Sequence, residues 1–176
     1  MRDAKMASTT IKISKIALHI GESESVEKLQ KAEKLLQELS GQKPLKTYAK
    51  NTISEWNVKK FAPIGVKVTM RGEKARAFLA RAFDAVENKV KEEQFDARGN
   101  LSFGIKEYIE IPDTKYDPDI GMFGLDVSVN LSRPGYSITR RAIKPSKLPK
   151  KAIITKEEAK NFFEGNFKVK VVAGSE

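Results

Sequence analysis

Hydrophobic and polar residues alternate in several stretches of the chain, which is the pattern of strands with one buried face. In the first stretch, Ile16, Leu18 and Ile20 are separated by polar or small residues. The same period returns further along the chain and ends each time near Gly, Pro or Asp. We therefore predict strands over residues 11–20, 64–71, about 105–111, 125–131 and 167–171.

Between these stretches the apolar residues follow a helical period. Ser23 or Ser25 can cap a first helix, which Gly41 stops. The sequence TKEE, which begins at Thr155, is a capping box for a short last helix that buries two phenylalanines and ends at Gly165. The predicted helices cover residues 23 or 25 to 40, 72–93 and 155–165.

This order of elements predicts an α+β fold with a mostly antiparallel sheet, helices packed on one face and the other face open. A chain of 176 residues suits one domain with one core, here residues 1–176. Residues 42–65 are expected to be irregular. Within them 43–62 form a flexible basic loop, and 133–151 form an extended basic arm with three prolines and no acid.

The charge of the chain indicates a polyanionic partner. Lys and Arg number 33 against 23 Asp and Glu, a formal net charge of +10. Such a field attracts nucleic acid, because each phosphate that meets a cation releases a counterion. Anionic membrane surfaces are the competing partner. The open face of the sheet is therefore interpreted as a platform for RNA.

Several function classes are excluded by composition. Without cysteine there is no disulfide framework, thiolate metal site or cysteine nucleophile, and the single histidine, His19, cannot form a histidine cluster. The N-terminus has no apolar core of a signal peptide, and no apolar run reaches the length of a membrane span. We expect a cytoplasmic protein with no cofactor and no metal.

Polar residues on two predicted strands form the main candidate site. Lys15 and His19 on one strand, and Lys67, Thr69 and Arg71 on another, project opposite their apolar neighbours. Cations and hydroxyls there can bind phosphates and 2′-hydroxyls. The same pattern also fits an ordinary solvated face.

The two basic segments are further candidates. The loop contains Tyr48 and Trp56 between lysines, which suits unstacked bases, although a lone Trp is more often a plug in the core. The arm has many cations that would repel each other without an anion. They are Arg133, Arg140, Arg141, Lys144, Lys147, Lys150 and Lys151.

A catalytic alternative rests on carboxylates. Asp113, Asp117 and Asp119, with Asp126 nearby, could hold Mg²⁺ for phosphodiester cleavage. Aspartates beside Pro118 and glycine are also ordinary turn residues, and that interpretation is favoured. We expect no enzyme.

Several segments together resemble one family. They are KIALHIGES, LSGQKPLKTYAK, PIGVKVTMRG, QFDARGNLSFGIKEY, KYDPDIGMFGLDVSVNLSRPGYSI and TKEEA. In order and spacing they are similar to the large-subunit ribosomal protein numbered five in bacteria and eleven in eukaryotes. The loop before GLDVSVNLSRPGY is closer to archaeal and eukaryotic members.

The resemblance implies a non-catalytic component of the large ribosomal subunit that attaches 5S ribosomal RNA in the central protuberance. It also implies contacts with large-subunit ribosomal RNA and neighbouring ribosomal proteins, with peptidyl-site transfer RNA, and with a small-subunit protein across an intersubunit bridge. The motifs carry the 5S contacts onto His19, Gln42, Thr69, Arg71, Leu125 and Asp126, to which the polar face adds Lys67. The loop toward transfer RNA gives Lys50, Trp56, Lys59 and Lys60.

His19 and Asp126 have side chains that bear on how they contact RNA. Bacterial members usually have asparagine where His19 stands, so its hydrogen bonding can differ. Asp126 is an anion facing a polyanion; it can accept hydrogen bonds from base amino groups or ribose hydroxyls, or orient Arg71.

Overall fold

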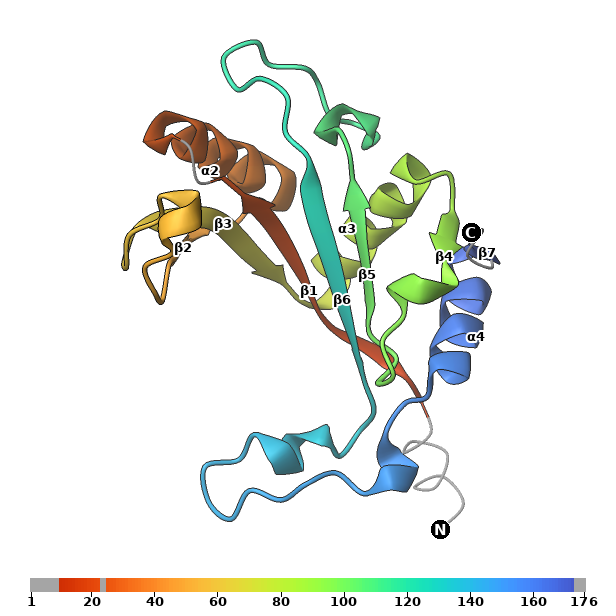
Figure 1. The fold of residues 1–176 in the computed structure, drawn as a ribbon. Coiled ribbons are helices and arrows are strands. Elements are labelled where there is room, and N and C mark those ends of the chain that lie inside the picture. Colours follow the sequence, from red (N-terminus) through yellow and green to blue (C-terminus); the bar gives the residue numbers. More distant parts are fainter. Residues whose placement is uncertain (1–9, 23–24, 173–176) are drawn as a thin grey trace.

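The computed structural model describes residues 10–22 and 25–172, which form an α+β fold (Figure 1). In the described part of the chain, an antiparallel five-stranded sheet has the order β2-β3-β1-β6-β5. Its strands are β1 (Lys12–Gly21), β2 (Leu45–Tyr48), β3 (Pro63–Met70), β5 (Leu101–Ile105) and β6 (Leu125–Ser132). A second, parallel pair joins β4 (Lys89–Lys91) to β7 (Lys170–Val172).

Helices α2 (Val26–Ser40) and α3 (Gly72–Ala85) cover the apolar face of this sheet (Figure 1). Alternate residues of the central strands, such as Ile16, Leu18 and Val127, are fully buried with the apolar stripes of the helices. Helix α4 (Lys156–Phe167) adds Phe163, which packs edge-on against Phe83 of α3. The predicted fold class is confirmed.

The predicted helix caps are confirmed where they are described. The Ser25 hydroxyl accepts a hydrogen bond from the Lys28 backbone N–H (3.2 Å), whereas Ser23, the other candidate, lies outside the described residues. Gly41 ends α2 in the left-handed conformation that favours glycine (φ 62°). Thr155 and Glu158 form the expected capping box of α4.

The prediction for the second helix is wrong at its C-terminus. The helix ends at Ala85 rather than near residue 93, because Glu87 and Asn88 adopt left-handed backbone angles that no helix continues. Val90, an apolar residue near the end of the predicted range 72–93, is buried, but from β4, beside Val171 of β7.

Other element boundaries also differ from the predictions. The strand expected at 105–111 is instead β5, and a 3-10 turn (Tyr108–Glu110) follows it. Helix α4 continues through Gly165 and ends before the left-handed Lys168, so the last strand begins only at Lys170. The segment expected to be irregular contains β2, a 3-10 turn (Ser54–Trp56) and the start of β3.

The arm departs from the main sheet after β6 and returns to α4, and Figure 1 shows it projecting beyond one end of the sheet. It has no long regular element, as its prolines suggested. Two short 3-10 turns, Tyr136–Thr139 and Lys150–Ala152, are its only helical parts within the described residues.

Candidate nucleic-acid interface

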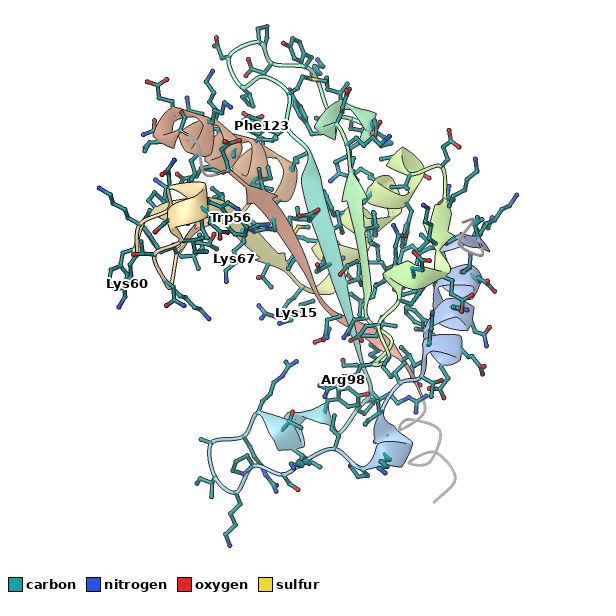
Figure 2. All side chains as sticks on the ribbon, in the orientation of Figure 1. Lys15, Trp56, Lys60, Lys67, Arg98 and Phe123 are labelled. Atoms are coloured by element: carbon teal, nitrogen blue, oxygen red, sulfur yellow. The ribbon has the colours of Figure 1, made fainter. Side chains whose placement is uncertain are left out.

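The side of the five-stranded sheet opposite α2 and α3 forms a polar surface, here called the open face. It consists of Lys15, Ala17, His19, Lys67, Thr69, Ser102, Gly104, Asp126, Ser128 and Asn130, all exposed or half-buried. Figure 2 labels its two lysines. Their strand neighbours on the other side are almost completely buried. The two faces therefore divide as the alternation predicted.

Strand register arranges the open face in rows. His19 of β1 is the partner of Lys67 on β3 and of Asp126 on β6, and Gly104 of β5 extends that row. The next row is Thr69, Ala17, Ser128 and Ser102. Antiparallel partners project to the same side, so each row presents neighbouring polar groups to one ligand.

The His19 imidazole lies over Gly65 and points toward Asp126. An ideal Cβ on Gly65 would be 2.9 Å from the His19 Nε2 atom and 3.1 Å from the Thr47 hydroxyl oxygen. The imidazole Nδ1 is 3.8 Å from the Asp126 carboxylate, and both side chains are substantially exposed. This open geometry leaves both groups available to a ligand.

Asp126, the carboxylate of this face, lies beside His19 and pairs with neither lysine within the described residues. Neither Lys15 nor Lys67 forms an ion pair within the described part of the chain. Arg71 is exposed at the N-cap of α3, one residue beyond β3, and likewise has no ion pair there. Unpaired cations beside hydroxyls suit phosphate and ribose groups.

Neutral polar groups that the sequence-based site omitted complete the face. The Ser102 hydroxyl donates to that of Ser128 (3.1 Å), and the Asn130 amide donates to Asn100 (2.7 Å). With Lys15 they border a hollow of about 760 Å³. Ser128 and Asn130 alternate with apolar residues in the sequence and could have been assigned to the open face. Asn100 and Ser102 could not, because the sequence placed that strand at about 105–111 and β5 begins at Leu101.

Two residues carried over from the family motif lie away from these rows. The Leu125 side chain is buried in the core, so it does not project from the open face. Gln42 is half-buried directly after the end of α2, where its backbone N–H donates to the Ser40 hydroxyl (3.2 Å).

The basic loop has defined local structure. Ile53 and Val58 pair as a short antiparallel bridge, and the Thr52 hydroxyl accepts from the Lys60 backbone N–H (3.1 Å). Trp56 between them is 70% exposed (labelled in Figure 2). The interpretation of this Trp as a core plug is therefore wrong. The candidate lysines are exposed as well; they are Lys50, Lys59 and Lys60.

Trp56 and other residues of the loop line an open pocket of about 770 Å³ against the end of β1. Ile53 and Val58 supply apolar walls, and Lys50 supplies a cation. An exposed indole beside lysines offers stacking and charge to an unpaired base.

The root of the arm is fixed. The Arg133 guanidinium, only 12% exposed, forms an ion pair with Glu158 of α4 (2.6 Å). The Tyr136 hydroxyl donates to the Ala152 carbonyl (2.9 Å) and accepts from the Ile154 backbone N–H (3.1 Å). Arg133 therefore has a carboxylate partner, whereas Arg140, Lys144 and Lys147 further along the arm form no ion pair within the described residues.

The loop that contains Asp113, Asp117 and Asp119 has the hydrogen bonds of a turn. The Asp117 carboxylate accepts from the Asp119 backbone N–H (2.9 Å), and the Tyr108 hydroxyl accepts from the Asp117 backbone N–H (3.2 Å). Among the residues described here, no group of three or more Asp, Glu, His or Cys is placed to hold a metal ion. Within the same residues no helix is both long and apolar enough to cross a membrane.

Comparison with known proteins agrees with the resemblance in the sequence. Residues 8–59 match the family model "Ribosomal protein L5", and residues 63–165 match the model for the C-terminus of the same ribosomal family. The chain is 50% identical over 165 residues to the large ribosomal subunit protein uL5 of Sulfurisphaera tokodaii, covering 93% of each chain. The protein of the same name from Methanosphaera stadtmanae is 48% identical over 159 residues (90% of this chain, 95% of the relative), and that from Sulfolobus acidocaldarius is 45% identical over 176 residues (99% of each).

Proposed function

The chain belongs to the ribosomal protein L5 family, and we propose that it is a structural component of the large ribosomal subunit that binds 5S ribosomal RNA and holds it in the central protuberance. Its role is structural and non-enzymatic. The nuclease alternative is therefore set aside.

The observation that carries the RNA-binding proposal is the open face. It joins hydroxyls, amides and cations that have no ion pair among the described residues, in register over several strands, while helices cover the opposite face. A platform of this kind suits folded RNA, which offers phosphates and 2′-hydroxyls at its surface. His19, Lys67, Thr69, Arg71 and Asp126 are the proposed contacts, together with Gln42 and the backbone at Leu125.

We further propose that the basic loop contacts peptidyl-site transfer RNA. The support is the exposed Trp56 among Lys50, Lys59 and Lys60. Large-subunit ribosomal RNA, neighbouring ribosomal proteins and a small-subunit protein across the intersubunit bridge are the remaining proposed partners, and they rest on the family resemblance.

The proposal is tested by measuring the affinity of the chain for a 5S ribosomal RNA transcript at several salt concentrations. Arg71→Ala should weaken binding about tenfold or more and lower the salt slope by about one, because one phosphate contact is lost. Thr69→Ala should weaken binding about fivefold without changing the slope, because a hydroxyl releases no counterion.

Lys74→Ala is the matched control, since Lys74 is an exposed cation on α3 just beyond Arg71. It should change the affinity by less than about threefold. The proposed face is wrong if Arg71→Ala and Thr69→Ala bind the transcript as tightly as the parent chain.

A further inference from the structure

A separate pocket lies where the root of the arm meets the end of the open face, and we call it the arm pocket. Its volume is about 530 Å³. Asn100 and Asn130 line it and also border the hollow on the open face, so the two spaces are adjacent. Figure 2 labels Arg98, another lining residue, at the end of the sheet from which the arm extends.

The arm pocket is strongly cationic. Arg98, Arg140 and Lys147 line it, and no Asp or Glu is among its lining residues. None of these three cations has an ion pair within the described residues. Three cations around one hollow repel each other unless an anion enters it, so the ligand carries negative charge.

Contacts within the chain hold the root of the pocket wall. The Arg133–Glu158 ion pair and the two hydrogen bonds of the Tyr136 hydroxyl join the two ends of the arm to each other and to α4. Because Tyr136 is held in place, binding does not have to order this part of the wall.

The shape and lining of the pocket suit a base as well as a phosphate. A duplex backbone is convex and touches a flat cationic face, whereas a hollow receives a group that protrudes from the RNA. Leu131 and Leu148 give this hollow apolar walls, and the half-buried Asn130 has an amide oxygen with no hydrogen bond among the described residues. Apolar surface and an amide suit a base, while the cations suit its phosphate.

We propose that the arm pocket takes one extruded nucleotide of the RNA that lies on the open face. The phosphate meets Arg98, Arg140 and Lys147, and the base enters between the apolar walls. This inference rests on the proposed function, because it requires RNA on the neighbouring face.

Two matched pairs of variants test the inference against a 5S ribosomal RNA transcript. Lys147→Gln and Lys144→Gln remove the same charge from the same arm, but only Lys147 lines the pocket. Lys147→Gln should weaken binding about tenfold, the value of one charge-assisted hydrogen bond, and Lys144→Gln less than about threefold.

The second pair separates a bound base from simple charge attraction. Thr139 lines the pocket, and its hydroxyl donates within the arm to the Tyr136 carbonyl (2.9 Å). Thr139→Phe fills the hollow and should weaken binding about tenfold, whereas Thr139→Val replaces only the hydroxyl with a methyl group of similar size and should leave binding within about twofold. Thermal unfolding of each variant checks that the fold is retained.

Chemical probing of the RNA 2′-hydroxyls gives the second readout. Binding of the parent chain should alter the reactivity of one unpaired nucleotide, and Thr139→Phe should restore its free value. If Lys147→Gln and Thr139→Phe bind like the parent, the arm pocket holds no RNA. If only Lys147→Gln is weakened, a phosphate is bound without an inserted base and the inference is overturned. Failure of the parent chain to bind the transcript would instead contradict the proposed function.

Discussion

Gly65 is the residue on which the arrangement of the open face depends most closely. An ideal Cβ at this position would lie 2.8 Å from the Ile20 carbonyl oxygen and 2.9 Å from the His19 imidazole. The neighbour at 2.8 Å is backbone of the adjacent strand and cannot move without disturbing the β1–β3 pairing. Glycine here leaves room for the His19 imidazole, whose Nδ1 atom lies 3.8 Å from the Asp126 carboxylate.

Gly65→Ala should therefore lower the free energy of unfolding by about 1–3 kcal/mol, the usual cost of overpacking. It should also weaken binding to 5S ribosomal RNA, because the imidazole is displaced. Gly104→Ala is the control on the same face, since its nearest neighbour would be at an ordinary 3.5 Å. Urea denaturation compares the two. Equal stability of both variants would mean that Gly65 does not constrain His19.

At the residue scale, the sequence correctly predicted which residues lie on the open face wherever their strand was placed correctly. His19, Lys67 and Thr69 were found by alternation alone, because period two assigns each residue to one face. The carried-over Leu125 shows the limit of a motif: its position is adjacent to the face, but its side chain is buried. The sequence favoured a buried Trp56, which is wrong, because the exposure of a loop side chain depends on what the loop packs against.

Helix α4 is the element that links the core to the arm. At the start of α4, the Glu158 carboxylate makes two contacts: it completes the capping box with Thr155, and it forms the ion pair with Arg133. The backbone N–H of Thr155, followed by the Arg133 guanidinium, lowers the pKa of Glu158 from its ordinary value of 4.5. Glu158 therefore stabilises the fold in its charged form.

The sign of the pH dependence follows from that lowered pKa. The contribution of Glu158 is fully present above its ordinary pKa and is lost as the pH falls through the lower pKa of the folded chain. Glu158→Gln should cost about 1 kcal/mol at neutral pH, a modest figure because this side chain is 41% exposed and screened by solvent. The difference from the parent should disappear in acid.

Urea denaturation at pH 7 and at about pH 3 measures this effect. Glu157→Gln, an exposed neighbour on the same turn, serves as the control and should be nearly neutral at both pH values. A Glu158→Gln penalty that is equally large in acid would show that the charge of Glu158 is not what secures the arm.

Some element boundaries depend on residues nearby in the sequence, and others depend on strands that are distant in the sequence. Caps at Ser25, Gly41 and Thr155 were predicted because each depends on residues a turn away. The short β4 was missed because its partner β7 is distant in the chain, and a stripe that includes Val90 looks helical until that pairing is known.

At the scale of the whole molecule, β1 is the central strand that joins the two halves of the chain in one sheet. It lies between β3 and β6, so the segments matched by the two family models share one sheet. The helices cover one side of that sheet, and the open face, the basic loop and the arm all present exposed or half-buried cations of a chain whose formal net charge is +10. One rigid platform with two cationic extensions can hold folded RNA without altering it chemically.

Lysine acetylation, read by mass spectrometry with and without a 5S ribosomal RNA transcript, tests most directly which side of the sheet carries the RNA. Lys15 and Lys67 on the open face should become protected when RNA is bound, while Lys31 and Lys34, exposed on α2, should react as before. Protection of the α2 lysines with Lys15 and Lys67 still reactive would contradict the account.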